Sequence, residues 1–265
     1  LIPADIKELK QKYNLKFVVQ PSTIRAFSDE EFLQAGAEVR EDLSDCSLII
    51  AVKEIPVNFF QENKKYLFFS HTIKGQKENI PILKKVMEKK ATLMDYEKIV
   101  DNNNRRLVFF GKYAGIACMI DSFYGYGQKL KFEGIATPFE KMKYATDYKD
   151  LNELKKEYAA IANEIKSSGL PFPVIIGIAG YGNVSQGAQE IIDLLPCTEL
   201  TPEELYKTHR STLATDRIYK VVFKEEDMVE PVNPSDPFDL LEYYHQPHKY
   251  QSKFYQYLPQ LNILI

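Results

Sequence analysis

An apolar run, a glycine-rich turn and a helical pattern follow one another over residues 174–195. Val174–Ala179 predicts a buried strand, and residues 186–195 predict a helix with apolar side chains on one face. Gly180 permits a tight turn between them, and Gly182 removes the side chain that would block a pyrophosphate. The helix N-terminus then offers free backbone N–H groups to the anion. The succession predicts a dinucleotide-binding α/β unit, with a plain tight turn as the alternative.

This turn departs from the usual fingerprint at one position. Ser185 stands where a third glycine is usual, and Gly187 supplies a small residue two positions later. The acidic residue expected about 20 residues on, which would bind the ribose hydroxyls, is ambiguous among Glu199, Glu203 and Glu204. The choice between NAD and NADP therefore stays open. The residues expected to bind the cofactor are Gly180, Gly182, Asn183, Val184, Ser185 and Gly187.

Short apolar segments alternate with helical patterns in the first part of the chain. Strands are predicted at 15–19, 47–52, 66–70 and 106–110, with a short extended segment at 91–94. Helices are predicted at 4–13, 29–37 and 80–89. This alternation indicates βαβ units and a mainly parallel sheet.

The middle and the end of the chain follow other patterns. Long helices are predicted at 113–130 and 151–168, before the α/β unit that begins at Val174. Residues 227–253 are rich in Pro, Tyr and acidic side chains, which predicts a long irregular excursion. Residues 261–265 predict a buried strand.

Composition excludes several classes of function. The 34 Lys and Arg are balanced by 37 Asp and Glu, whereas a nucleic-acid binder working through bulk charge carries a basic surplus. No apolar run approaches the roughly 18–20 residues of a membrane helix, so no membrane partner is expected. Cys46, Cys118 and Cys197 lie far apart, which argues against disulfides and fits a reducing cytoplasm. His245 and His248 lack a third ligand, so no metal is expected.

Polar residues follow two of the predicted strands. Lys53 and Glu54 come after one strand, and His71 and Lys74 come after the next. Ligands bind at the carboxyl ends of parallel strands, so Lys53 and His71 are expected to face one crevice. Together they could transfer protons if burial and mutual repulsion lower their pKa values toward neutrality. A solvent-exposed lysine and a histidine that merely caps a strand are equally supported alternatives.

A third polar group surrounds the segment predicted as the strand 106–110. It consists of Asp95, Glu97, Arg105 and Arg106. Arginine suits bidentate carboxylate binding, although a solvated turn is the favoured interpretation for Arg105.

Longer motifs run in order along nearly the whole chain. They are Lys53-Glu-Ile-Pro56, Ser70-His-Thr-Ile-Lys-Gly-Gln76, Leu93-Met-Asp-Tyr-Glu97, Arg105-Arg-Leu-Val-Phe-Phe-Gly111, Thr137-Pro-Phe139, Gly182-Asn-Val-Ser-Gln-Gly-Ala-Gln189, Leu195-Pro-Cys197 and Tyr257-Leu-Pro259. In this order they resemble the lysine-ketoglutarate reductase family, the lysine-forming saccharopine dehydrogenases. The detail is most similar to the reductase half of bifunctional aminoadipic semialdehyde synthases, with alanine dehydrogenase and the transhydrogenase nucleotide subunit as more distant relations.

The resemblance implies reductive condensation of lysine with 2-oxoglutarate to saccharopine, with NADP or NAD as cofactor. It implies that Lys53 and His71 are the acid–base pair, because imine formation needs repeated proton shuttling. Lys74 and Arg106 resemble partners of the substrate carboxylates. Glu54 resembles an acid that tunes the pair or holds the lysine amine, and Glu97 resembles another.

The same resemblance implies an α/β fold of two Rossmann-like domains with mainly parallel sheets, joined by long helices, with a ligand cleft between them. Residues 1–115 would form a substrate domain like the N-terminal domain of alanine dehydrogenase and transhydrogenase, and residues 116–169 the linking helices. Residues 170–265 would form the nicotinamide-nucleotide-binding domain. The family has an opening strand before Leu1 and further strands after Ile265, so both domains are expected to be incomplete.

Two other functions remain as alternatives. One is an amino-acid dehydrogenase of the alanine type, which uses ammonia. The other is a non-catalytic regulatory module that keeps the nucleotide-binding fold. The expected partners are the small-molecule substrates lysine, 2-oxoglutarate and saccharopine, without nucleic acid, and the sequence is compatible with a homodimer.

Overall fold

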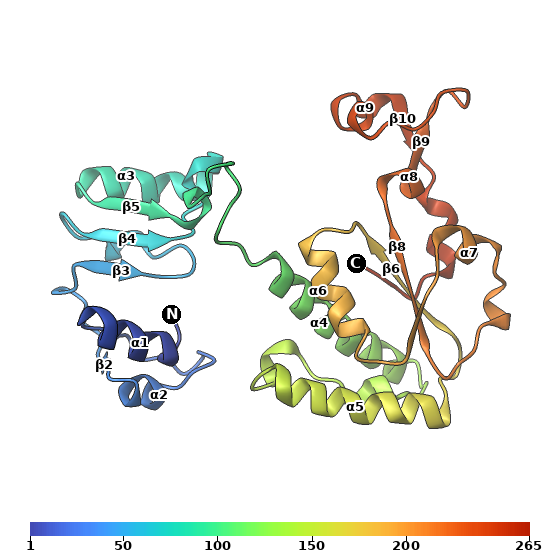
Figure 1. The fold of residues 1–265 in the computed structure, drawn as a ribbon, viewed down its shortest axis with the longest axis horizontal. Helices are drawn as coiled ribbons and strands as arrows, with labels where there is room; N and C mark the ends of the chain where they lie inside the picture. Colours follow the sequence, from blue (N-terminus) through green and yellow to red (C-terminus); the bar gives the residue numbers. More distant parts are fainter. The chain divides into compact units, whose positions relative to one another are not determined.

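The computed structural model describes residues 1–265, which divide into two compact units, Leu1–Phe109 (unit 1) and Phe110–Ile265 (unit 2). Helices and strands occur in both units, and their sheets are mainly parallel (Figure 1). The predicted α/β class with mainly parallel sheets is therefore confirmed. No helix combines the length and the apolar character needed to cross a membrane.

Unit 1 holds a three-stranded parallel sheet in the order β3-β4-β5 and a separate parallel pair of β1 and β2. Its strands are β1 (Val18–Val19), β2 (Glu38–Val39), β3 (Leu48–Ile50), β4 (Lys65–Phe68) and β5 (Thr92–Asp95). Its helices are α1 (Pro3–Tyr13), α2 (Asp29–Gln34) and α3 (Ile80–Glu88). Short 3-10 turns follow β4 at Thr72–Lys74 and β5 at Tyr96–Lys98.

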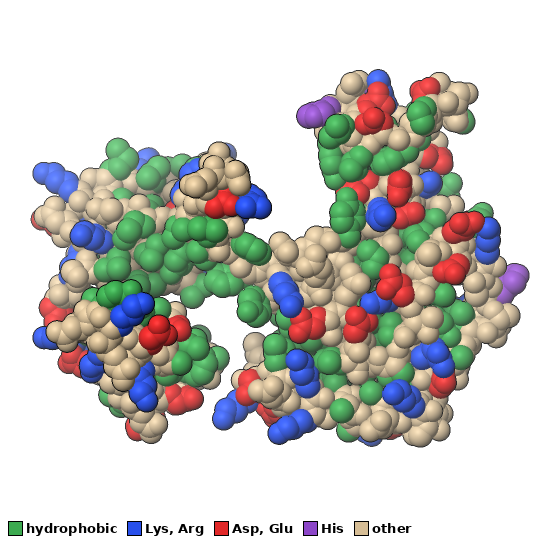
Figure 2. Space-filling view, in the orientation of Figure 1, with side chains coloured by type: hydrophobic (Ala, Val, Ile, Leu, Met, Phe, Trp, Pro, Cys, Tyr) green, Lys and Arg blue, Asp and Glu red, His purple; other side chains and the backbone are tan.

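The two faces of the β3-β4-β5 sheet differ in burial. The buried cluster that joins this sheet to α3 contains Ile49, Tyr66, Phe68, Ile82 and Val86. On the other face Leu48, Ile50 and Met94 remain exposed. Figure 2 shows hydrophobic side chains gathered over this part of unit 1. The core of the sheet thus lies on the α3 side, which fixes the direction in which alternate strand residues point.

Unit 2 is built on a four-stranded parallel sheet in the order β11-β6-β8-β7. Its strands are β6 (Val174–Ala179), β7 (Cys197–Glu199), β8 (Ile218–Phe223), β9 (Val229–Pro231), β10 (Tyr250–Ser252) and β11 (Ile263–Leu264). Its helices are α4 (Gly111–Phe132), α5 (Leu151–Ser168), α6 (Asn183–Ile192), α7 (Pro202–Lys207), α8 (Glu225–Met228) and α9 (Leu240–His245). The predicted strand Val174–Ala179 and helix Leu151–Ser168 are confirmed residue for residue.

The main core of unit 2 joins α4, α5 and α6 to the sheet. It includes Met119 and Phe123 of α4, Tyr158 of α5, Ile176 of β6 and Ile192 of α6, all fully or nearly fully buried. Both long helices thus pack within unit 2. The division of the chain at residues 115 and 169 stays a prediction.

Two predictions of local structure are wrong. The segment 106–110 is not a strand: Arg106 forms one isolated bridge with Val100, and Asp101 accepts backbone N–H groups that turn the chain between them. The apolar Phe109 stays half exposed rather than entering a sheet. The segment 227–253 is not irregular throughout, because β9 and β10 pair antiparallel and, with α9, stand out from the main sheet (Figure 1).

Candidate active site

The carboxyl ends of β3 and β4 bring Lys53, Glu54 and His71 into one region of unit 1. The β3 and β4 strands are parallel neighbours, and Phe69 N–H donates to the Val52 carbonyl at 3.1 Å just beyond them. The imidazole Nδ1 of His71 forms a short hydrogen bond with Glu54 Oε1. This contact lowers the pKa of Glu54, with a smaller contribution from the Lys53 charge. The residues that the sequence placed at one strand edge are neighbours in the structure.

The backbone of His71 adopts an uncommon conformation. Its φ of 52° lies in the left-handed region, which few non-glycine residues adopt, and Gly75 closes the following turn with φ of 65°. The side chain of His71 is 23% exposed, and its ring stacks near Phe69 at 6.3 Å between centroids. The imidazole is therefore held by Glu54 on one side, which leaves Nε2 as the nitrogen for a ligand.

A second polar group centres on the buried carboxylate of Glu97. Its side chain is 3% exposed, and its Oε1 lies 3.1 Å from Lys74 Nζ and 3.1 Å from Arg106 Nη2. The other oxygen, Oε2, is buried without a hydrogen-bond partner. A buried carboxylate oxygen that lacks a partner is costly, and the two cations at Oε1 offset part of this cost. The structure brings Glu97, Lys74 and Arg106 together.

Sequence analysis named Asp95 in the third polar group but assigned it no role, and the structure shows that this residue joins the ends of β4 and β5. Asp95 accepts hydrogen bonds from the Ser70 backbone N–H at 3.2 Å, from the Ser70 hydroxyl, and from the Glu97 backbone N–H at 2.8 Å. Ser70 is fully buried, and its hydroxyl also lies 2.8 Å from Thr72 Oγ1. Asp95 therefore fixes the turns that carry both His71 and Glu97. The sequence signals were the position of Asp95 after a short extended segment and its place in the motif Leu93–Glu97.

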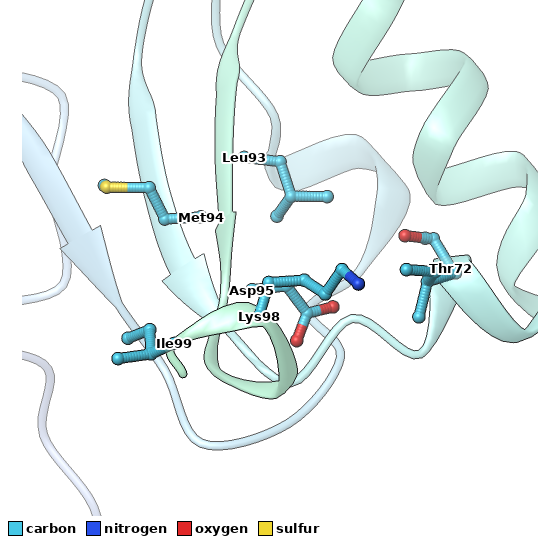
Figure 3. Close-up of a pocket in the computed structure, with 7 residues that line it drawn as sticks. Thr72, Leu93, Met94, Asp95, Lys98 and Ile99 are labelled. Atoms are coloured by element: carbon cyan, nitrogen blue, oxygen red, sulfur yellow. The ribbon is translucent and has the colours of Figure 1, made fainter. Parts of the chain in front are cut away.

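A pocket of about 440 Å³ lies against this network in unit 1 (Figure 3). It is lined by Thr72, Ile73, Leu93, Met94, Asp95, Lys98 and Ile99. Apolar side chains from β5 form part of the lining, and Asp95 and Lys98 supply charged groups of both signs. A mixture of apolar walls and a few polar groups is typical of small-molecule sites.

The predicted glycine turn lies between β6 and α6 in unit 2. Gly180 has φ of 116°, in the region that favours glycine, and its N–H donates to the Phe223 carbonyl at 2.9 Å. A Cβ at Gly180 or Gly182 would meet no atom within 4 Å. Gly182 is the N-cap of α6, and no side chain hydrogen-bonds to the first N–H groups of this helix. The turn therefore leaves room and donors for an anion.

The remaining predicted cofactor residues have different surroundings. Asn183 and Val184 are exposed at the start of α6, whereas Ser185 is buried and accepts from Gln189 Nε2 at 3.0 Å. A Cβ on Gly187 would lie 1.9 Å from the Lys112 carbonyl oxygen of α4. Gly187 therefore serves the packing of α6 against α4, and its role in cofactor binding stays a prediction.

Comparison with known proteins finds a family match for the first part of the chain and a similar fold for most of its length. Residues 1–117 match the family model described as alanine dehydrogenase/PNT, N-terminal domain. The solved structure of an L-alanine dehydrogenase matches with a TM-score of 0.50 and 17% identity, over 83% of this chain and 56% of that one. At this identity the likeness shows the fold alone.

Three curated relatives match the sequence more strongly. The chain is 38% identical to an α-aminoadipic semialdehyde synthase of Arabidopsis thaliana over 94% of the chain and 25% of that protein. It is 35% identical to the mitochondrial α-aminoadipic semialdehyde synthase of Mus musculus, over 96% and 27%. A lysine-forming, NAD(+) saccharopine dehydrogenase of Yarrowia lipolytica is 30% identical, over 61% and 45%. The chain thus spans about a quarter of the length of the two synthases.

Proposed function

We propose that this chain, a relative of the α-aminoadipic semialdehyde synthases and lysine-forming saccharopine dehydrogenases as its motifs predicted, carries lysine-ketoglutarate reductase activity. The reaction condenses the ε-amine of lysine with the ketone of 2-oxoglutarate and reduces the product to saccharopine with NADH or NADPH. The observation that carries the proposal is the His71–Glu54 hydrogen bond beside Lys53, at the ends of two neighbouring parallel strands. It supplies the proton-transfer groups that this reaction needs.

The acid–base step is assigned to His71 and Lys53. Condensation requires two protons to leave the amine nitrogen and two to reach the ketone oxygen, which is lost as water as the C=N bond forms. The Glu54 carboxylate holds His71 Nδ1 and so orients the ring, and Nε2 is the atom that exchanges protons with the substrate. The Lys53 ammonium, next in sequence to Glu54, is the second group that moves protons.

Substrate binding is assigned to the group around Glu97. The side chains of Lys74 and Arg106 are about half exposed. Each can therefore bind a substrate carboxylate while it remains ion-paired to Glu97. Glu97 also places a negative charge beside these two cations, and that charge attracts the amine of lysine. Positive and negative groups side by side match substrates that carry both charges.

The dinucleotide is assigned to the glycine turn of unit 2. The open space at Gly180 and Gly182 and the uncapped N-terminus of α6 fit a pyrophosphate. The residues that would hold it are the backbone groups of Gly182, Asn183 and Val184. The reduced nicotinamide supplies the hydride, and the protein supplies its position.

The test is oxidation of NADH or NADPH by the full-length protein when lysine and 2-oxoglutarate are supplied together. We expect turnover with both substrates and none when either is left out. Lys53→Met and His71→Gln should each lower kcat at least a hundredfold while the protein stays folded. The matched controls are Lys65→Met, at the opposite end of β4 from His71, and His209→Gln, a histidine of unit 2 to which no role is assigned. A folded protein without turnover with either cofactor contradicts the proposal.

Two alternative outcomes are informative. Turnover with pyruvate and ammonia but not with lysine indicates an alanine-type dehydrogenase. If the Lys53→Met and His71→Gln substitutions leave the function of the protein unchanged, the chain is a non-catalytic regulatory module. The cytoplasmic location and the homodimer stay predictions, and the mouse relative is named as mitochondrial.

A further inference from the structure

The turn after β4 places His71 in a backbone conformation that needs support. Its φ of 52° lies in the left-handed region, which is costly for a residue other than glycine. The hydrogen bond to Glu54 holds the ring of His71, but it does not hold the backbone. The residues on either side of His71 must therefore keep the backbone in this conformation.

Ser70 and Thr72 form a bridge of hydrogen bonds across His71. The Ser70 side chain is fully buried, and its Oγ lies 2.8 Å from Thr72 Oγ1 and 3.3 Å from Thr72 N. Because the single hydroxyl proton of Ser70 is donated to Asp95, the Ser70 oxygen accepts from both groups of Thr72. The bridge ties together the two residues that flank His71 and thereby restricts the rotation of its backbone.

Asp95 anchors this bridge to the neighbouring strand. Its Oδ2 accepts from the Ser70 N–H at 3.2 Å and from the Ser70 hydroxyl. Its Oδ1 accepts from the Glu97 N–H at 2.8 Å. One carboxylate thus holds two turns: the turn after β4, which carries His71, and the turn after β5, which carries the buried Glu97 carboxylate.

Aromatic rings connect the same two turns. The ring of Tyr96, in the turn after β5, lies 5.0 Å from that of Phe69 between centroids, and the Phe69 ring stacks near His71 at 6.3 Å. A shift of the turn after β5 therefore also moves the rings against which the imidazole packs. His71 follows the central strand β4, and it is held from the β3 side by Glu54 and from the β5 side by Asp95.

We propose that Asp95 is a positioning residue of the reductase reaction. Through Ser70 it sets the direction of the His71 imidazole, and through the backbone of Glu97 it sets the place of that carboxylate. This inference rests on the proposed function, which assigns proton transfer to His71 and substrate binding to the group around Glu97. The two links use different oxygens of Asp95, so loss of the first should change kcat and loss of the second should change KM.

The test compares the steady-state kinetics of variants of the full-length protein with lysine, 2-oxoglutarate and NADH or NADPH. Asp95→Asn keeps the shape, but in either orientation its amide group leaves one backbone N–H without an acceptor. We expect its kcat to fall at least about tenfold and its KM for 2-oxoglutarate to rise severalfold. Ser70→Ala removes the hydroxyl and keeps the link to Glu97, so its kcat should fall about twofold to tenfold at an unchanged KM.

A matched pair at Thr72 separates positioning from packing. Thr72→Val keeps the shape and loses the hydroxyl, so kcat should fall severalfold, whereas Thr72→Ser keeps the hydroxyl and should retain kcat within about twofold. Asp42→Asn is the control for the loss of a carboxylate. Asp42 binds the N–H and the hydroxyl of Ser44 at 2.8 and 2.9 Å, on an exposed turn before β3, and its substitution should leave kcat and KM unchanged.

Amide hydrogen exchange, followed by mass spectrometry of the peptides from both turns, measures the positioning without turnover. Asp95→Asn should accelerate exchange in both turns, and Ser70→Ala only in the turn that contains Thr72. Unchanged exchange or full turnover in the folded Asp95→Asn protein overturns the inference, and so do equal losses of kcat in the two Thr72 variants. Turnover by the unaltered protein alongside either result leaves the proposed function standing, whereas no turnover by the unaltered protein refutes both.

Discussion

Gly187 of α6 lies so close to the Lys112 carbonyl of α4 that a Cβ on this glycine would be 1.9 Å from the oxygen. The relationship is reciprocal, because a Cβ on Gly115 would be 1.9 Å from the Val184 carbonyl oxygen. An ion pair between Lys112 and Glu190 at 2.7 Å spans the same two helices. In both cases the nearest atoms belong to the backbone of the facing helix, so no flexible side chain could move aside to make room for a Cβ.

Gly187→Ala should therefore destabilise unit 2 by about 3 kcal/mol or more, since two helices must separate to admit one methyl group. Urea unfolding followed by circular dichroism measures this change. Gly125→Ala is the matched control on α4, where a Cβ would meet nothing within 4 Å. That variant should be more stable by about 0.5–1 kcal/mol, because alanine favours a helix interior. Equal stabilities of the two variants would contradict the close packing.

Arg105 and Arg106 are neighbours in sequence with different partners. Arg105 pairs with Asp101 at 2.8 Å on the surface, whereas Arg106 pairs with the buried Glu97. If Arg106 binds a substrate carboxylate, Arg106→Ala should raise the KM for 2-oxoglutarate about tenfold or more, as expected for loss of a charged hydrogen bond. Arg105→Ala should leave that KM within about twofold. Steady-state kinetics of the two variants measures these KM values. Equal changes in both variants would contradict a role for Arg106 in binding the substrate carboxylate.

The Glu54–His71 contact predicts a pH dependence of stability. The contact lowers the pKa of Glu54 below its ordinary value of 4.5. The stabilisation is therefore present above about pH 4.5 and is lost as the pH falls through the lowered pKa. Because the Glu54 side chain is about a third exposed, we expect less than about 1 kcal/mol.

Thermal unfolding of Glu54→Gln and of the unaltered protein from pH 7 to pH 3 measures this effect. The difference in Tm should be largest near neutrality and should shrink below pH 4.5. The exposed Glu78→Gln serves as the control. A difference that grows toward acid would show that the sign is wrong.

The three thiols should differ in reactivity. Burial raises the pKa of Cys197 to about 12 and, to a lesser extent, raises that of Cys46, so few thiolates form at either site near neutral pH. Cys118 is exposed on α4. Labelling with iodoacetamide at pH 8 and peptide mapping should therefore find Cys118 modified first and Cys197 last. Rapid labelling of Cys197 in the folded protein is the contrary result.

Much of the secondary structure could be predicted from the sequence. Val174–Ala179 is a continuous apolar run, and Leu151–Ser168 has a clear helical period. Such local patterns are enough to identify a strand and a helix. The segment 106–110 has a comparable apolar run, but Asp101 turns the chain before it and no strand lies beside it. Pairing with a neighbour, rather than composition, decides whether such a run becomes a strand.

The arrangement of the polar residues was harder to predict from the sequence. Glu54 and His71 contact each other because they follow two adjacent parallel strands. The alternation of strands and helices along the sequence predicts such a parallel sheet. The bonds from Asp95 to Ser70 could not be predicted, because they join a side chain to a backbone N–H far away in sequence. The insertion of β8 between β6 and β7 could not be predicted either, since strand order depends on crossovers that leave no local pattern.

The contact between Gly115 and α6 has a consequence for how such proteins can exchange parts. The family model extends to residue 117, whereas the compact units meet at Phe109 and Phe110. A chimera joined after residue 117 would take Gly115 from one parent and Gly187 from the other. A side chain larger than glycine at either position would then clash with the backbone of the facing helix. The segment that is inherited as a family is thus longer than the body that packs, and recombination between relatives is safest one helical turn or two before the family boundary.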